Sequence, residues 1–138
     1  LISGVSWDHI NVFPSEDEYV RQFEIFADST PKAGSLIFCD EDPLTSMTGN
    51  KEREDVYAIS YKTHPHVIDN GITYLMNGKD SFPLKIFGKH NLQNISGAKE
   101  VLKKIGITED QFYQAITSFE GASKRLELIA ENDQSAVY

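Results

Sequence analysis

Apolar residues along this chain fall into short continuous runs separated by stretches with helical spacing. The runs at 1–6, 34–39 and 56–61 contain no charged residues and predict buried strands. Strands that alternate with helices along a sequence are typical of an α/β domain. We therefore expect a mostly parallel sheet with flanking helices.

Two helices are predicted between these strands. Ser15 stands three residues before a glutamate, a spacing typical of a capping box at the start of a helix. Tyr19, Phe23 and Phe26 then fall on one side, which is the predicted inner face. A weaker helix is expected from 44 to about 50, after an acidic turn.

The pattern changes in the middle of the chain. Short apolar runs at 67–68, 72–75 and 82–87 are separated by the pairs Asn70-Gly71 and Asn77-Gly78. Asn-Gly pairs between apolar runs are hairpin signals, because both residues tolerate a positive φ. The sequence therefore predicts a small antiparallel hairpin unit.

Two further helices are expected in the last third. The first begins after Gly88 and ends at Gly106, a residue typical of a helix C-terminus. Its predicted inner residues are Ile95, Ala98, Leu102 and Ile105. The second is capped by Thr108, and its predicted inner residues are Phe112, Ala115, Ile116 and Phe119. Two short strands around a turn at 132–134 are expected to follow.

Composition and charge exclude several classes of protein. The net charge is −8, and residues 1–60 hold four Lys or Arg against twelve Asp or Glu, which argues against a nucleic-acid partner. No run is long enough to cross a membrane, and no signal peptide is visible. Cys39 is the only cysteine, which excludes an internal disulfide and fits a reducing compartment. Both ends lie in apolar runs, so we expect a piece of a longer protein.

Polar residues gather where the chain passes from an apolar run into the helix after Gly88. Lys89 and His90 come first, and Asn91 and Asn94 are three residues apart, so they share one face of the first turn. A cation, free amides and a helix N-terminus at one point can hold a nucleotide base or phosphate. Spacing alone favours a helix cap for the asparagines and a solvated charge for the lysine.

Two other residues are candidates for phosphate or metal chemistry. His9 follows a predicted strand, at the sheet edge where ligands of α/β proteins bind, and its imidazole could join the shell of a divalent cation. The alternative, which spacing favours, is a strand-end histidine bonded to backbone. Arg125 lies in a predicted linker and could contact phosphate oxygens; the alternative is a surface ion pair with Glu120 or Glu127.

The motifs that activate phosphate are missing from the sequence. It contains no glycine-rich loop that ends in Gly-Lys-Ser/Thr, and no nucleophile–base pair. His64 and His66 flank a proline without a third ligand nearby, and we expect a polar loop there rather than a metal site.

Three segments, in their order along the chain, resemble the Mur ligase family of ATP-dependent amide-bond ligases of peptidoglycan synthesis. They are Trp-Asp-His at 7–9, Gly-Lys-His-Asn-Leu-Gln-Asn at 88–94 and Ser-Phe-Glu-Gly-Ala-Ser-Lys-Arg-Leu-Glu at 118–127. The resemblance covers nearly the whole chain. It implies that residues 1–121 are the second (C-terminal) half of the family's central ATP-binding domain, and 122–138 the linker and first strands of the C-terminal ligase domain.

The resemblance also implies roles for single residues. His9 matches a histidine at a Mg²⁺ site, and His90, Asn91 and Asn94 match residues around the adenine of ATP. Arg125 matches a catalytic arginine at the domain junction that contacts the phosphates of ATP. The carbamylated lysine of several family members has no counterpart, because phenylalanine and glutamate stand at 23–24; the glutamate is a possible substitute.

The function implied is that of a cytoplasmic ligase in which ATP phosphorylates the carboxylate of UDP-N-acetylmuramate and an amine attacks the acyl phosphate. The subgroup that most resembles the chain adds the peptide L-Ala-γ-D-Glu-meso-diaminopimelate in peptidoglycan recycling. The alternatives are the subgroup that adds L-alanine and a non-enzymatic nucleotide-binding module of the same fold. Without the phosphate loop, the chain alone is expected to be inactive and to bind ATP weakly or not at all.

Overall fold

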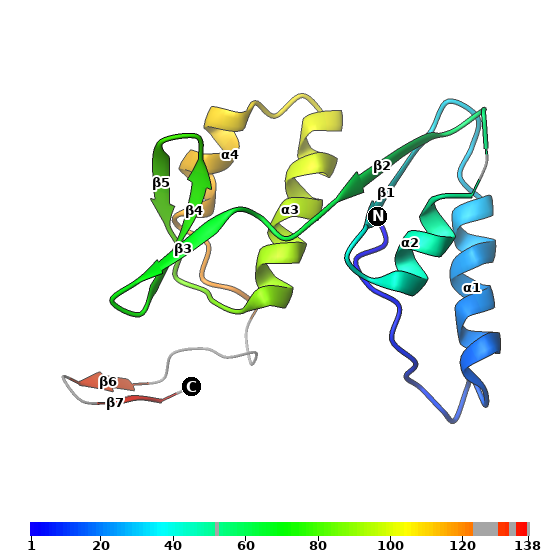
Figure 1. The fold of residues 1–138 in the computed structure, drawn as a ribbon, viewed down its shortest axis with the longest axis horizontal. Coiled ribbons are helices and arrows are strands. Elements are labelled where there is room, and N and C mark those ends of the chain that lie inside the picture. Colours follow the sequence, from blue (N-terminus) through cyan, green and yellow to red (C-terminus); the bar gives the residue numbers. More distant parts are fainter. Residues whose placement is uncertain (52, 123–129, 133–134, 138) are drawn as a thin grey trace.

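The computed structural model describes residues 1–51, 53–122, 130–132 and 135–137 (Figure 1). The first part contains α1 (Glu16–Asp28), β1 (Ser35–Cys39), α2 (Pro43–Gly49) and β2 (Tyr57–Tyr61). The second part contains β3 (His66–Asp69), β4 (Ile72–Asn77), β5 (Asp80–Pro83), α3 (Lys89–Lys104) and α4 (Glu109–Ile116). After these, β6 (Ala130–Asn132) pairs antiparallel with β7 (Ser135–Val137), as expected for strands around a turn.

A parallel sheet forms the centre of the first part. β1 and β2 pair in parallel from Ser35 opposite Tyr57 to Cys39 opposite Tyr61. The N-terminal segment lies on the other side of β1, where Ile2 makes a parallel bridge to Phe38. The strand predicted for residues 1–6 is wrong beyond this single bridge. The predicted α/β class with a parallel sheet is confirmed.

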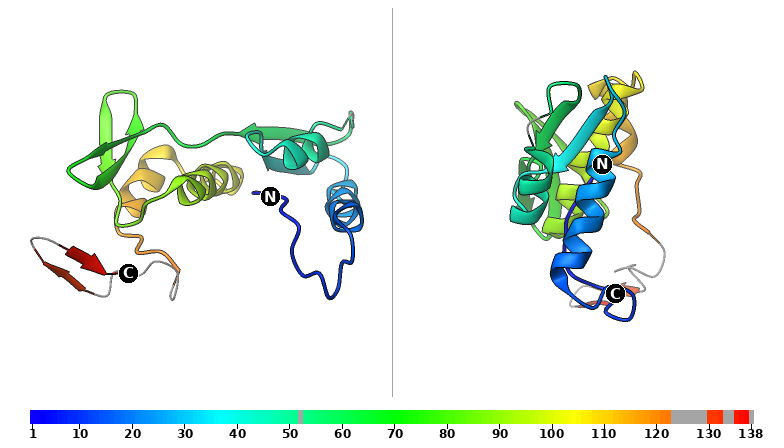
Figure 2. Two further views of the ribbon diagram at one scale, coloured as in Figure 1. Left: turned by 60° about the horizontal axis from the view of Figure 1, so that its bottom comes forward. Right: turned by 90° about the vertical axis from the view of Figure 1, so that its right-hand side faces the viewer.

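Helices cover both faces of this sheet, and Figures 1 and 2 show the arrangement. On one face, α1 and α2 pack over a core that contains Ile2, Val5, Leu36 and Phe38. On the other face, Val101 of α3 packs against Ile37, Cys39 and Tyr61. Buried positions on both faces explain why β1 is apolar from Leu36 to Cys39.

One glycine allows α3 to approach the sheet closely. A Cβ atom at Gly97 would lie 2.8 Å from the Cζ atom of Tyr61 in β2. Such a distance is shorter than side-chain atoms tolerate, so a larger residue would push the helix away from the strand.

The predicted antiparallel unit is also confirmed. β3, β4 and β5 form a three-stranded sheet in sequence order, with two-residue turns between neighbours. Asn70 and Gly71 in the first turn have φ values of 48° and 81°, as hairpin turns of this length require. β5 ends at Pro83, so the strand predicted for 82–87 is wrong beyond that residue.

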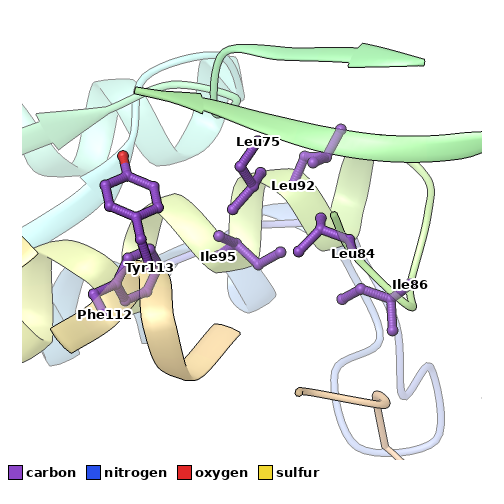
Figure 3. Close-up of a cluster of buried hydrophobic side chains, with 7 residues drawn as sticks. All are labelled: Leu75, Leu84, Ile86, Leu92, Ile95, Phe112 and Tyr113. Carbon is purple, nitrogen blue, oxygen red and sulfur yellow. The ribbon is translucent and has the colours of Figure 1, made fainter. Parts of the chain in front are cut away.

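A second core joins this sheet to α3 and α4, as Figure 3 shows. Its buried residues are Leu75, Leu84, Ile86, Leu92, Ile95, Phe112 and Tyr113. Because α3 also packs on the parallel sheet, it is the element that both parts of the chain share.

Several predicted inner positions are wrong. Phe26 is 54% exposed, Ile105 is 70% exposed and Phe119 is 46% exposed, and Ala98 and Ala115 are exposed as well. Ile105 and Phe119 lie beyond the ends of α3 and α4. Within α1 and α4 the rotation of the helix differs from the predicted one, so Ala27 and Tyr113 are buried. Helical spacing identified the helices but not the exact rotation of each one.

None of the described helices is long and apolar enough to cross a membrane.

Candidate functional site

The carboxyl ends of the parallel strands lead to one edge of the sheet. The N-terminal segment, β1 and β2 run in the same direction, so the loops that follow them leave from the same side. These loops contain His9, Glu41 and Thr63, respectively. In parallel α/β folds this edge is where ligands bind.

Glu41 connects this edge to the amino end of α3. Its Oε2 atom accepts a hydrogen bond of 3.0 Å from Nε2 of Gln93 and another from the hydroxyl of Thr63. The Lys89 ammonium lies 3.8 Å from the same oxygen. One carboxylate therefore joins the loop after β1, the loop after β2 and the first turns of α3.

These contacts keep the carboxylate ionised. The hydrogen bonds from Thr63 and then from Gln93 hold the pKa of the Glu41 carboxyl below its usual value, and they outweigh the opposing effect of partial burial. Lys89 contributes in the same direction.

The amino end of α3 has backbone donors that no side chain caps. Gly88 occupies the N-cap position with a φ of 93° and no side-chain hydrogen bond, and the first turn contains no acidic residue. The first N–H groups of a helix lack intrahelical partners and carry partial positive charge. This end of α3 can therefore accept an anion or a polar ring edge.

The residues predicted around the nucleotide base lie on this first turn. Asn91 is half-buried, and its Nδ2 atom donates a hydrogen bond of 2.7 Å to the carbonyl of Phe87. This bond fixes the entry into the helix but satisfies no free N–H, so the predicted capping role is not what the structure shows. His90 and Asn94 are exposed. Among the described residues, neither side chain has a hydrogen-bond partner, so both can contact a ligand.

A pocket of about 460 Å³ lies beside this turn. It is formed by the β3–β4 hairpin and the start of α3, and its lining includes Ile68, Thr73, Phe87, Lys89 and Leu92. His90, Asn91 and Asn94 are not part of this lining. The pocket therefore faces a different side of the helix from the predicted base contacts.

His9 lies in a tight, exposed loop. Its backbone N–H donates to Oδ1 of Asp8 at 2.6 Å, and its carbonyl accepts hydrogen bonds from the amides of Val12 and Phe13 at 2.7 and 2.9 Å. With a φ of 56°, His9 has an unusual backbone conformation for a residue other than glycine. Its imidazole has no hydrogen bond to the described residues, in contrast to the backbone-bonded alternative.

A complete metal site is not formed by the residues that the structure describes. No three or more of their His, Cys, Asp and Glu side chains gather so as to hold a metal ion. Glu24, considered as a substitute for a lysine, lies in α1 with its Oε1 atom 3.5 Å from Nζ of Lys51. The polar loop predicted around His64 and His66 is wrong: His64 is buried and bonds to the Tyr113 hydroxyl, and His66 is the first residue of β3.

Arg125 lies outside the described residues. Of its two alternative ion-pair partners, Glu120 is bonded to Lys85 at 2.5 Å. The other partner, Glu127, is also outside the described part of the chain.

Sequence patterns missed the residues that join the sheet edge to α3. Glu41 belongs to the acidic turn predicted after β1, and Gln93 follows Lys89 by four residues, so both side chains lie on one side of α3. That spacing was the available signal. It does not identify the partner, because Glu41 is 52 residues away in sequence.

Comparison with known proteins identifies relatives along the whole chain. The sequence is 26% identical to UDP-N-acetylmuramate–L-alanine ligase of Carboxydothermus hydrogenoformans, over 99% of this chain and 32% of that protein. It is 28% identical to UDP-N-acetylmuramoylalanine–D-glutamate ligase of a Geobacter species, over 100% of this chain and 32% of that protein. The chain is thus similar to Mur ligases over nearly its whole length. It spans about a third of the length of these curated relatives.

A similar fold is found among solved structures. A solved structure of a pseudomurein peptide ligase type C from Methanothermus fervidus superposes with a TM-score of 0.67 and 16% identity, over 94% of this chain and 36% of that one. At this identity the match shows a shared fold. No model of a protein family matches the chain.

Proposed function

We propose that the chain is the nucleotide-binding part of a longer ATP-dependent ligase that joins UDP-N-acetylmuramate to an amino acid or peptide. The observation that carries the proposal is the similarity to Mur ligases over 99% of the chain. The site supports it, because the free amino end of α3 and the carboxyl edge of the parallel sheet lie together through Glu41.

In this proposal, the amino end of α3 recognises the adenine of ATP. The Asn94 carboxamide offers a donor and an acceptor side by side, which match the adenine edge. The exposed His90 ring can stack on or bond to the base, and Asn91 holds the first turn in place through Phe87. Recognition therefore uses side chains on one face of a fixed helix.

The phosphates of ATP extend from α3 along the sheet edge towards His9. Mg²⁺ prefers oxygen ligands and usually retains several waters, so His9 fits as a single ligand beside phosphate oxygens, and the described residues supply no complete shell. When bound, the ion would neutralise phosphate charge. The His9 carbonyl accepts hydrogen bonds of 2.7 and 2.9 Å that fix the loop. The imidazole takes no part in these bonds and is therefore available to the ion.

In the proposed chemistry, the muramyl carboxylate takes the terminal phosphoryl group of ATP and ADP leaves. An amine then attacks the acyl phosphate, and the amide forms as inorganic phosphate leaves. Arg125 is proposed as the catalytic residue, because a guanidinium matches the geometry of phosphate oxygens and stabilises their charge. We place it in a linker, residues 122–138, that begins the next domain, whereas residues 1–121 belong to the ATP-binding domain. Closure of one domain on the other would bring Arg125 to the phosphates.

The identity of the amine is the open part of the proposal. The runs Trp-Asp-His-Ile-Asn-Val-Phe at 7–13, Gln-Phe at 22–23 and Lys-Arg-Leu-Glu at 124–127 resemble the subgroup that adds L-Ala-γ-D-Glu-meso-diaminopimelate in peptidoglycan recycling. The relatives named as L-alanine ligases favour the alternative, in which the amine is L-alanine. A nucleotide-binding module without ligase activity is the third possibility.

An assay of ADP release by the natural full-length protein tests the function. ATP, Mg²⁺ and UDP-N-acetylmuramate are supplied with the tripeptide, with L-alanine or with neither, and UDP-N-acetylglucosamine, which lacks the carboxylate, is the matched control. We expect ADP only when the muramate and an amine are both present. A higher kcat/KM for the tripeptide supports the recycling role, and a higher value for L-alanine supports the alternative. ATP binding without ADP under any condition contradicts a ligase and favours the non-enzymatic module.

A further inference from the structure

The first turns of α3 are held by a carboxylate from a distant part of the chain. Glu41, in the loop after β1, accepts hydrogen bonds from Gln93 of α3 and Thr63 of the loop after β2, and lies 3.8 Å from Nζ of Lys89. Three segments that are far apart in sequence thus meet at one side chain.

The contact with Gln93 is the one that orders the helix. Gln93 is only 9% exposed, and its amide donates to Glu41 at 3.0 Å. Removing the acceptor would leave a buried donor without a partner, which costs more than an exposed hydrogen bond contributes. The Lys89 ammonium is largely in solvent, so its attraction to Glu41 is screened.

No other distant side chain bonds to this end of α3 among the residues that the structure describes. Asn91 bonds only to Phe87, within the entry to the helix. The next distant polar contact is Lys99, whose ammonium lies 2.9 Å from Glu109 of α4. The amino end of α3 therefore depends on Glu41 for its polar connection to the sheet edge.

We propose that Glu41 is a positioning residue, which sets the amino end of α3 against the carboxyl edge of the parallel sheet. It contacts no nucleotide itself. It acts through Gln93, and it aligns the donors that hold the base with the edge along which the phosphates lie. The inference rests on the proposed function and adds a residue that determines how well ATP binds.

Glu41→Ala and Glu109→Ala in the natural full-length protein form a matched pair. Each removes a carboxylate that bonds to α3, one at the amino end and one in the carboxyl half. Two readouts are measured: amide hydrogen exchange of residues 89–96 without nucleotide, and the KM for ATP and kcat in the ADP-release assay. Exchange reports the helix end by itself, so it is independent of whether the protein is a ligase.

We expect Glu41→Ala to speed exchange in 89–96 and to raise the KM for ATP about tenfold, the size of one lost charged hydrogen bond. kcat at saturating ATP should stay within about twofold, because no contact made only in the transition state is lost. Glu109→Ala should change neither the exchange of residues 89–96 nor the KM for ATP. Equal exchange in Glu41→Ala and the unchanged protein, or an equal rise in KM for both variants, overturns the inference.

Two further variants cover the other outcomes. Gln93→Leu removes the helix partner of Glu41 and should have the same effect as Glu41→Ala, so it replaces that variant if Glu41→Ala does not fold. The variant with both changes should lose no more than either single variant. Additive losses in the double variant overturn the role of Gln93. If the unchanged protein binds no nucleotide, the proposed function is wrong, and exchange alone decides whether Glu41 holds the helix end.

Discussion

The two halves of the chain that meet on α3 are built differently. The parallel half, with β1, β2, α1 and α2, has a core on both faces of its sheet but still exposes large apolar side chains, among them Phe26, Met47 and Tyr57. The antiparallel half, with β3 to β5 and α4, also exposes large apolar side chains such as Ile68 and Ile72, but it has a single core and an additional polar network around the buried Tyr113.

That network fixes the carboxyl half of α3. The Tyr113 hydroxyl lies 3.0 Å from Nε2 of His64 and accepts a hydrogen bond of 2.9 Å from Lys99, which also pairs with Glu109. Burial lowers the pKa of the His64 imidazole, so the ring is neutral at pH 7. Its Nδ1–H donates to the Pro65 carbonyl, and Nε2 accepts from Tyr113.

This difference suggests a division of roles: the antiparallel half supports α3, and the edge of the parallel sheet contributes to ligand recognition. The antiparallel half holds α3 with groups that pair with one another, and two of them, His64 and Tyr113, are buried. The parallel half contributes loops with exposed groups such as His9, and its described residues include one exposed carboxylate, Glu41, that reaches α3. Damage to the antiparallel half should therefore change stability, and damage to the sheet edge should change binding.

The largest expected effect is a loss of stability in the parallel half from Gly49→Ala. The new Cβ atom would lie 2.2 Å from Cγ of Phe38, a ring that is 1% exposed. Because the ring has no room to move, we expect a loss of at least about 2 kcal/mol in the free energy of unfolding. Gly4→Ala is the control, since no atom lies within 4 Å of its Cβ position. Chemical denaturation measures both; equal stability of the two variants would contradict the packing described here.

A smaller loss is expected from Tyr113→Phe in the antiparallel half. The ring and its stacking on Phe82, at 4.6 Å between centroids, are retained. The hydroxyl is lost, which leaves His64 and Lys99 each without one partner, so stability should fall by about 1–3 kcal/mol. ATP affinity should not change in the folded protein. A Tyr113→Phe protein that is fully stable but binds ATP poorly would remove the distinction between the halves.

The sequence predicted the elements better than it predicted their faces. Local signals sufficed where one residue determines the backbone, as with Ser15 and Thr108 at helix starts and Asn70-Gly71 in the hairpin turn. They failed where tertiary contact sets the rotation of a helix. Tyr113 was missed because its burial depends on partners at 64 and 99, which no local window contains.

The candidate site was predictable to a similar degree. The residues at 88–94 lie together at a helix start, as the spacing implied. The carboxylate that holds them was not recognised, because Glu41 and Gln93 come together only when β1 and α3 pack. The roles of His9, Asn94 and Arg125 stay predictions, carried by the resemblance to the family.

ATP affinity of Asn94→Ala in the natural full-length protein tests the central claim, base recognition by α3, most directly. The matched control is Gln114→Ala, which removes an exposed carboxamide on α4. Ile68→Trp fills the neighbouring pocket and tests whether the base binds there instead. We predict that Asn94→Ala weakens ATP binding about tenfold, as expected for the loss of a paired contact to adenine, and that Gln114→Ala and Ile68→Trp bind ATP normally. Arg125→Ala should instead lower kcat with little change in affinity. Normal ATP binding by Asn94→Ala together with weak binding by Ile68→Trp would contradict the account and place the base in the pocket.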